Sequence, residues 1–271
     1  MAGLDVAVVQ MEVCSGEVQK NWVRAEARIA EAARQGAQAI LLPELWTTGY
    51  DWAAMPRLAE PPDGPTVQRL RRLAAQHGVT LVAGSIAERR PGGIYNTSYI
   101  LGPDGSVLGT YSKQHLFPLL DEPRYLAPGA DPAPVETPHG RWGQLICFDI
   151  RYPEAARSLT MAGIAILWVP AEWPHPRLEH WRTLLRARAI EDQLFVVAAN
   201  RTGQGDGNQW CGHSQIIDPW GTVVAEADED EVTLRATLDL DLIAQVRGRV
   251  PCFAVDAVTG AAADRVAGAR G

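Results

Sequence analysis

Short apolar segments alternate with helical ones along most of the 271 residues. An apolar stretch over Asp5–Gln10 precedes residues that recur at helical spacing from Val18 to about Gln35. The pattern returns in the second half, where an apolar stretch at Trp142–Phe148 leads into a helix predicted over Pro153–Ala162. Strands that alternate with helices in this way predict an α/β fold, in which helices cover sheets of mixed direction.

The other predicted elements continue the alternation. Helices are expected over Thr66–His77 and Leu178–Asp192, and strands over Ala39–Leu42, Val79–Ile86, Thr97–Leu101, Val107–Tyr111, Ala165–Val169, Leu194–Ala199, His213–Ile217, Thr222–Ala225 and Val232–Thr237. Turn signals at 102–105 and 218–221 predict hairpins, so parts of the sheets are expected to be antiparallel. No Pro-, Gly- or Ser-rich linker divides the chain. We therefore predict one domain over residues 1–258, followed by a tail, 259–271, that is loosely ordered or lies on a partner subunit.

Composition excludes several classes of function. The formal charge of −7 argues against a nucleic-acid partner, and no apolar run approaches the ~18 residues of a membrane helix. The four cysteines are scattered and no signal peptide is visible, which predicts free thiols and a cytoplasmic location. Histidines and cysteines show no metal-ligand spacing, so we expect no metal and no cofactor. A small-molecule substrate and a homodimer or higher homo-oligomer are the expected partners.

Cys147 ends a strand-like apolar run, and a helix start with Pro153 and Glu154 follows it. A thiol at such a junction is held on a rigid turn near backbone N–H groups, an environment that favours the reactive thiolate. The alternative is that Cys147 is a small buried hydrophobic residue, as free cysteines often are. The junction alone leaves both interpretations open.

Two further ionisable residues follow apolar strands, where the catalytic groups of α/β sheets collect. Glu44 comes after the strand at Ala39–Leu42, and Lys113 after the strand at Val107–Tyr111. A thiol needs a base or a nearby cation to react at neutral pH, so Glu44 is the candidate base and Lys113 the candidate cation. The apolar neighbours of Glu44 are expected to raise the pKa of its carboxyl group, which suits a general base.

Three segments in order resemble the nitrilase superfamily of carbon–nitrogen hydrolases: Pro43-Glu44, Tyr111-Ser-Lys113-Gln-His-Leu-Phe117 and Cys147-Phe-Asp-Ile-Arg151-Tyr-Pro-Glu154. The resemblance covers nearly the whole chain, from Val6 to about Phe253. It implies a four-layer α-β-β-α sandwich with two mixed sheets and a Glu-Lys-Cys triad.

The same resemblance assigns further roles. The backbone N–H of Phe148 would join Lys113 in stabilising an oxyanion. A second glutamate follows the lysine loop in this superfamily; Glu122 matches that place best, with Asp121 as its competitor.

The segments Ala171-Glu-Trp173-Pro-His-Pro-Arg177 and Asn200-Arg-Thr-Gly203 resemble the omega-amidase branch, which hydrolyses 2-oxoglutaramate and 2-oxosuccinamate. Such a substrate needs a cation for its remote carboxylate. Arg177 and Arg151 are candidates, since a guanidinium binds a carboxylate through two hydrogen bonds.

For Arg151 the favoured interpretation is different, namely that it pairs with a core acid and supports the turn at Cys147. Four aromatic residues are candidates either for the wall of a small pocket or for the core: Trp46, Tyr50, Tyr125 and Trp173.

Alternatives remain at three points. His115 could form a Cys-His pair with the thiol, although the resemblance makes it structural. The glycine-rich segment 203–207 lacks the Lys-Ser/Thr of a phosphate loop and is predicted to be a flexible loop. The function could also be that of an N-carbamoyl amine hydrolase, an aliphatic amide or nitrile hydrolase, or a non-catalytic binding protein on the same fold.

Overall fold

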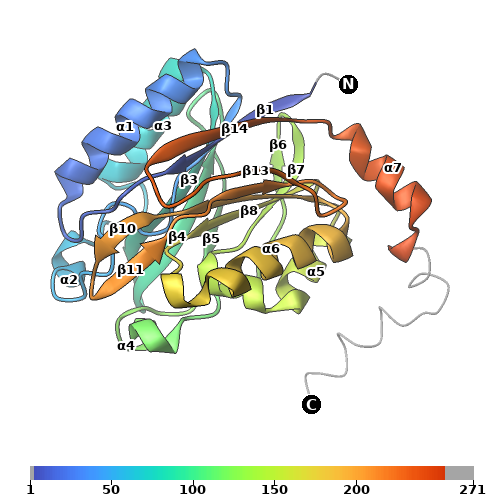
Figure 1. Cartoon of the computed structure of the whole chain (residues 1–271). Coiled ribbons are helices and arrows are strands. Elements are labelled where there is room, and N and C mark those ends of the chain that lie inside the picture. Colours follow the sequence, from blue (N-terminus) through green and yellow to red (C-terminus); the bar gives the residue numbers. More distant parts are fainter. Residues whose placement is uncertain (1–2, 254–271) are drawn as a thin grey trace.

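Two six-stranded sheets form the centre of the molecule in the computed structural model, which describes residues 3–253 (Figure 1). The strands of the first sheet are β1 (Leu4–Gln10), β2 (Ala39–Leu41), β3 (Thr80–Arg90), β4 (Gly93–Leu101), β5 (Val107–Ser112) and β14 (Val232–Leu238). Those of the second sheet are β6 (Val135–Thr137), β7 (Gly140–Gln144), β8 (Ile166–Ala171), β9 (Phe195–Asn200), β12 (Gln215–Ile217) and β13 (Val223–Glu226). Their spatial orders are β14-β1-β2-β3-β4-β5 and β13-β12-β9-β8-β7-β6. Both sheets mix parallel and antiparallel pairs.

Helices cover the outer faces of both sheets. The first sheet packs against α1 (Val18–Arg34) and α3 (Pro65–His77), the second against α6 (Leu178–Asp192), which contacts α5 (Pro153–Met161). The shorter elements are α2 (Met55–Leu58), η1 (Pro118–Leu120), α4 (Glu122–Tyr125), η2 (Cys147–Arg151), η3 (His175–Arg177), β10 (Thr202–Gly205), β11 (Asn208–Cys211) and α7 (Asp241–Arg249). The predicted four-layer sandwich is therefore confirmed.

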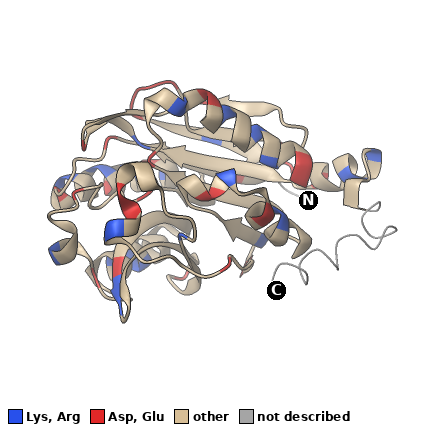
Figure 2. Cartoon of the chain, turned by 90° about the horizontal axis from the view of Figure 1, so that it is seen from below, with Lys and Arg blue, Asp and Glu red and all other residues tan. Residues whose placement is uncertain are grey.

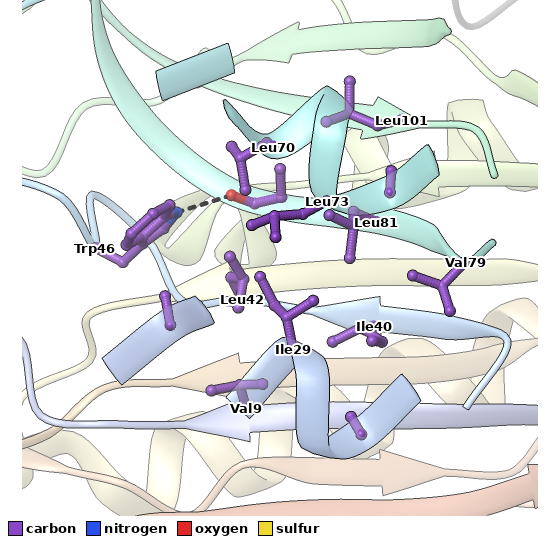
Figure 3. Packing of buried hydrophobic residues seen from close by; sticks show 14 of the residues in the cluster. Val9, Ile29, Ile40, Leu42, Trp46, Leu70, Leu73, Val79, Leu81 and Leu101 are labelled. Atoms are coloured by element: carbon purple, nitrogen blue, oxygen red, sulfur yellow. Dashed lines mark hydrogen bonds between the residues drawn. The ribbon is translucent and has the colours of Figure 1, made fainter. Parts of the chain in front are cut away.

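The layers follow from the two-residue repeat of the strands. Val9 and Ile40 point outward to the helices, whereas Val8 and Leu41 point inward to the other sheet. The apolar face of α1 meets the outward set through Ile29 (Figure 3). Because both faces of these strands are buried, they read as continuous apolar runs rather than alternating ones.

Some predicted elements end elsewhere in the structure. The strand expected over Trp142–Phe148 stops at Gln144, and Cys147 begins the single turn η2 instead. The segment 203–207 is not a loop of undefined structure, because it forms the end of β10 and the turn of the hairpin β10–β11. That hairpin lies with α2 and α4 at one end of the sandwich (Figure 1). The predicted tail 259–271 lies outside the described residues.

Lys and Arg residues are interspersed with Asp and Glu residues along the helices and loops drawn in Figure 2. The sequence-based expectation against a nucleic-acid partner stays a prediction. Over residues 3–253, no helix combines the length and the apolar character needed to cross a lipid bilayer.

Candidate active site

Glu44, Lys113 and Cys147 meet between the two sheets although they lie far apart in the sequence. Glu44 follows β2 and Lys113 follows β5 of the first sheet, while Cys147 lies after β7 of the second. All three side chains are buried, with exposed fractions of 0%, 0% and 3%. Charged residues are almost never fully buried unless they are paired, so this convergence marks a specialised site.

The carboxylate of Glu44 is held by three donors. Its Oε1 accepts hydrogen bonds from Lys113 Nζ at 2.8 Å and from Asn96 Nδ2 at 2.8 Å. Its Oε2 accepts a hydrogen bond from the backbone N–H of Glu172 at 2.8 Å. Donors on both oxygens fix the orientation of the carboxylate before any ligand arrives.

The backbone around Glu44 depends on a close approach of two strands. A Cβ on Gly84 would lie 2.0 Å from the carbonyl oxygen of Pro43, so only glycine fits at this position in β3. Leu45 adopts a φ of +39°, and its N–H donates to Ser85 Oγ at 2.9 Å. The turn that presents Glu44 is therefore fixed by β3 rather than by Glu44 itself.

Lys113 is shared by two carboxylates, because its Nζ also donates to Glu122 Oε1 at 2.6 Å. Burial acts to lower the pKa of Lys113, but the charges of Glu122 and Glu44 outweigh it and raise the pKa well above its usual value. Glu122 also accepts hydrogen bonds from the hydroxyl of Tyr50 and the N–H of Phe117. Lys113 thus stays charged at neutral pH.

Of the two acids considered for the second position, Glu122 is the one that contacts the lysine. Glu122 is fully buried at the start of α4, where burial raises the pKa of its carboxyl group against the opposing effect of Lys113. Asp121 lies at a φ of +59°, and its exposed carboxylate contacts Arg124. Only Glu122 is therefore placed to position the lysine or a substrate.

Cys147 has a φ of +48°, a conformation that costs a non-glycine residue about 1–3 kcal/mol. Asp149 holds this turn, because its Oδ2 accepts hydrogen bonds from the N–H of Ile146 at 3.0 Å and from the hydroxyl of Tyr111 at 2.8 Å. The N–H of Phe148 lies in the first turn of η2, where backbone donors have no partner within the helix.

The thiol of Cys147 differs from the sequence-based expectation. Burial, with the negative charge of Glu44, raises the pKa of Cys147 well above its ordinary value. The thiol is therefore protonated at rest, because burial disfavours its charged form. Such a thiol needs a base that takes its proton as it reacts.

His115 is not placed to be that base. Its Nδ1 lies 2.9 Å from Asp149 Oδ1, its backbone N–H donates to the same oxygen, and its ring stacks on Tyr152 at 3.5 Å. These contacts brace the turn that carries Cys147. The structural role implied by the resemblance matches this geometry, and the Cys-His alternative has no contact to support it.

A small cavity of about 10 Å³ opens beside the thiol of Cys147. Its other lining residues are Phe117, Phe148, Arg151, Trp173, Pro174 and Arg177. Three of these are aromatic and two are guanidinium groups, so the cavity offers apolar walls and a concentrated positive charge. A ligand larger than a water molecule enters only if some of these side chains move.

Arg151 lies beside Arg177 and not beside an acid. Its guanidinium lies over the ring of Trp173 at 4.7 Å and contacts His180 Nδ1 at 3.2 Å. Burial lowers the pKa of Arg151, and the positive charge of Arg177 adds to this effect. Pairing with a core acid, the favoured interpretation from sequence, is therefore wrong: within residues 3–253 neither arginine forms an ion pair.

The family model described as "Carbon-nitrogen hydrolase" matches residues 5–248. The chain belongs to this family. The 2-oxoglutaramate amidase of Bacillus subtilis (strain 168) is 44% identical over 249 residues, which are 92% of this chain and 95% of that protein. The human omega-amidase NIT2 is 34% identical over 263 residues, covering 93% and 95% of the two chains. The crystal structure of a CN-hydrolase superfamily protein from Xanthomonas campestris superposes with a TM-score of 0.87 at 32% identity, covering 93% and 96%.

The aromatic candidates of this carbon–nitrogen hydrolase occupy different places. Trp173 lines the cavity, and Tyr50 is buried with its hydroxyl on Glu122. Tyr125 is exposed on the surface and stacks on Trp52. Trp46 belongs to the outer core under α1 and α3, where its indole N–H donates to the carbonyl of Ala83 (Figure 3). Of these four candidates, only Trp173 therefore lines the cavity beside the thiol.

Sequence reasoning missed several residues that build the site. Asn96 and Glu172 contact Glu44, Asp149 holds the turn of Cys147, and Arg201 pairs with Glu172. Asp149 lies inside a recognised motif, and a buried acid two residues after a nucleophile was a usable signal. For the others the only signal was a polar residue at or just after a strand. No group of three or more potential metal ligands occurs in the described part of the chain.

Proposed function

We propose that this chain is an omega-amidase that hydrolyses the terminal amide of a small dicarboxylate monoamide, with 2-oxoglutaramate or 2-oxosuccinamate as substrate. The observation that carries the proposal is a buried thiol beside two guanidinium groups that have no acidic partner in the described chain. The names of the relatives at 44% and 34% identity support the same activity.

The chemistry starts from a neutral thiol. Glu44 removes the proton of Cys147 as sulfur attacks the amide carbon, and a tetrahedral intermediate forms. Glu44 then returns that proton to the amide nitrogen, ammonia leaves, and a thioester to Cys147 remains. Water activated by Glu44 cleaves the thioester and releases the carboxylic acid and the free thiol.

Lys113 and the N–H of Phe148 stabilise the negative oxygen of the intermediate. A buried ammonium with a strongly raised pKa keeps its charge throughout the cycle, and donors fixed before reaction are worth far more here than in water. Glu122 accepts a hydrogen bond from Lys113, and the hydroxyl of Tyr50 donates to Glu122, so both residues help to hold the lysine in place. Lys113, Glu122 and Tyr50 are already ordered by their hydrogen bonds, so these side chains need little reorganisation.

The remote carboxylate of the substrate binds Arg177 and Arg151. Two neighbouring cations that repel each other are stabilised by an anion between them, and a guanidinium offers a carboxylate two parallel hydrogen bonds. Trp173 and Phe117 supply apolar surface for the short carbon chain. A neutral amide would leave both charges without compensation.

We expect 2-oxoglutaramate to be hydrolysed with a higher kcat/KM than neutral amides, carbamoyl amines or nitriles. A ligand without a carboxylate leaves the half-buried Arg151 and Arg177 without the charge-assisted hydrogen bonds that the keto acid makes. The measurement is ammonia release from purified protein with 2-oxoglutaramate, glutamine, propionamide, N-carbamoylputrescine and an aliphatic nitrile side by side. If propionamide, the carbamoyl amine or the nitrile ranked first, the omega-amidase assignment would be rejected while the mechanism at Cys147 remained.

Arg177→Ala should raise KM for 2-oxoglutaramate by roughly 10- to 100-fold, because a charge-assisted pair contributes about 1.5–3 kcal/mol. It should also narrow the preference for this substrate over propionamide. Arg141→Ala is the control, since Arg141 is an exposed arginine on β7 that forms an ion pair with Glu136. Equal KM values for Arg177→Ala and the parent protein would exclude Arg177 from the carboxylate site.

A further inference from the structure

Glu172 is a buried carboxylate that the reaction described above does not use. It follows β8 directly and is fully buried. Its Oε2 accepts a hydrogen bond from Arg201 Nη1 at 2.9 Å, but its Oε1 has no hydrogen-bond partner in the described chain. A buried polar atom without a partner costs about 1–3 kcal/mol, so an acid at this position requires an explanation.

The backbone of Glu172 touches both of the groups that react. Its N–H donates a hydrogen bond to Glu44 Oε2 at 2.8 Å. Its carbonyl oxygen accepts a hydrogen bond from the thiol of Cys147, with Sγ at 3.8 Å. No other residue in the described chain forms hydrogen bonds with both of these side chains. The conformation at Glu172 therefore sets how the base and the nucleophile are oriented toward each other.

The side chain of Glu172 is anchored by a second buried group. Arg201 is itself fully buried, and its guanidinium also donates to Asp206 Oδ2 at 3.2 Å and lies over the ring of Trp210 at 4.6 Å. Asp206 also accepts a hydrogen bond from the N–H of Tyr50. Arg201 therefore connects Glu172 to the hairpin β10–β11 and, through Asp206, to the segment that follows Glu44.

We propose that Glu172 is a positioning residue: its side chain, held by Arg201, orients its own backbone N–H and carbonyl between Glu44 and Cys147. This inference rests on the proposed reaction only for the roles of those two residues, and not on the identity of the amide. Glu172 acts through its neighbours and has no contact with the cavity beside the thiol.

The protonation state of Glu172 suits this role. Burial raises the pKa of Glu172 to about 8, against the lowering effect of Arg201, and the charge of Glu44 adds to the rise. The neutral form therefore predominates at neutral pH and places no second charge beside Glu44. Glutamine has the same shape as that neutral form and can accept the hydrogen bond from Arg201.

The test compares Glu172→Ala with Glu172→Gln. A displacement of about 1 Å can cost 10²-fold in rate, so Glu172→Ala should lower kcat by about 10- to 100-fold and change KM by less than about threefold. Glu172→Gln should restore most of kcat. An equal loss in both variants, or a loss confined to KM, would overturn the positioning role.

A second measurement does not depend on the amide substrate. Iodoacetamide alkylates the thiol, and peptide mass mapping reports the rate at Cys147 itself. We expect this rate to fall in Glu172→Ala in parallel with kcat and to recover in Glu172→Gln. An unchanged alkylation rate in a folded Glu172→Ala protein would refute the inference, whereas absence of turnover in the parent protein would refute only the proposed function.

Glu88→Ala is the matched control for loss of a buried acid. Glu88 lies in β3 and is 2% exposed. It forms an ion pair with Arg90 at 3.1 Å and accepts a hydrogen bond from the hydroxyl of Tyr99. Its removal should lower the melting temperature without changing kcat or the alkylation rate. If Glu88→Ala lowered both to the same extent as Glu172→Ala, general destabilisation would account for the effect and the inference would fail.

Discussion

Cys147→Ala is expected to abolish ammonia release, with no turnover above the background of the assay. The thioester forms on this sulfur, so its removal leaves no covalent route. Alanine also removes only one buried atom from a position whose backbone is held by Asp149, so the fold should survive. The measurements are ammonia release and the melting temperature of the same preparation.

Cys211→Ala is the matched control, because Cys211 is a buried free thiol in β11 that has no contact with Glu44 or Lys113. It should retain the activity of the parent protein. Incubation with substrate followed by acid quenching should give a mass increase on the peptide that contains Cys147. Turnover by a folded Cys147→Ala protein would remove Cys147 as the nucleophile.

Glu44→Gln and Lys113→Met should each reduce kcat/KM by roughly 10²–10⁴, the usual loss of a general base or an oxyanion donor. Their effects on stability should differ. Glutamine keeps an oxygen acceptor for Asn96 and Lys113 but places its amide NH2 opposite the N–H of Glu172, which then loses its acceptor. Methionine leaves two buried carboxylates without their cation, which costs about 3–5 kcal/mol when one partner of a buried pair is removed. Steady-state kinetics and urea unfolding measure the two effects separately.

His115→Ala separates this mechanism from a Cys-His one. The imidazole contacts Asp149 and Tyr152, so its loss should loosen the turn and lower kcat/KM by about tenfold or less. A crippling effect of His115→Ala together with a mild effect of Glu44→Gln would transfer the role of base to His115.

The alternation of short apolar runs with segments of helical period predicts an α/β fold, and the resemblance to the nitrilase superfamily adds the four layers. The inward and outward sets of β1 and β2 are apolar apart from Asp5 and Gln10, and α1 carries a clear apolar face. The apolar pattern does not show at which residue a strand ends. The strand before Cys147 looks continuous through Phe148, yet the φ of +48° at Cys147 ends it. That conformation is stabilised by Asp149, a contact with no periodic signal.

The three residues that we propose as the triad could be found from sequence because each follows an apolar strand within a recognised motif. The contacts around these residues could not be predicted from the sequence, because they join segments that lie far apart in the chain. Arg201 and Glu172 are 29 residues apart, and Arg151 meets Arg177 only after η2 and η3 are placed side by side. The sequence also predicted the wrong resting state for the thiol, because it does not reveal that Cys147 is buried beside the negative charge of Glu44.

The division of the site between the two sheets has a consequence for biosynthesis. Glu44 and Lys113 belong to the first sheet, whereas Cys147 follows a strand of the second. A ribosome-bound chain that has emerged only as far as β5 carries the acid and the ammonium but no nucleophile. The later half, folded alone, would carry a thiol with neither. We therefore expect hydrolytic capacity to appear only once the two sheets have packed together, so that its recovery during refolding reports that step.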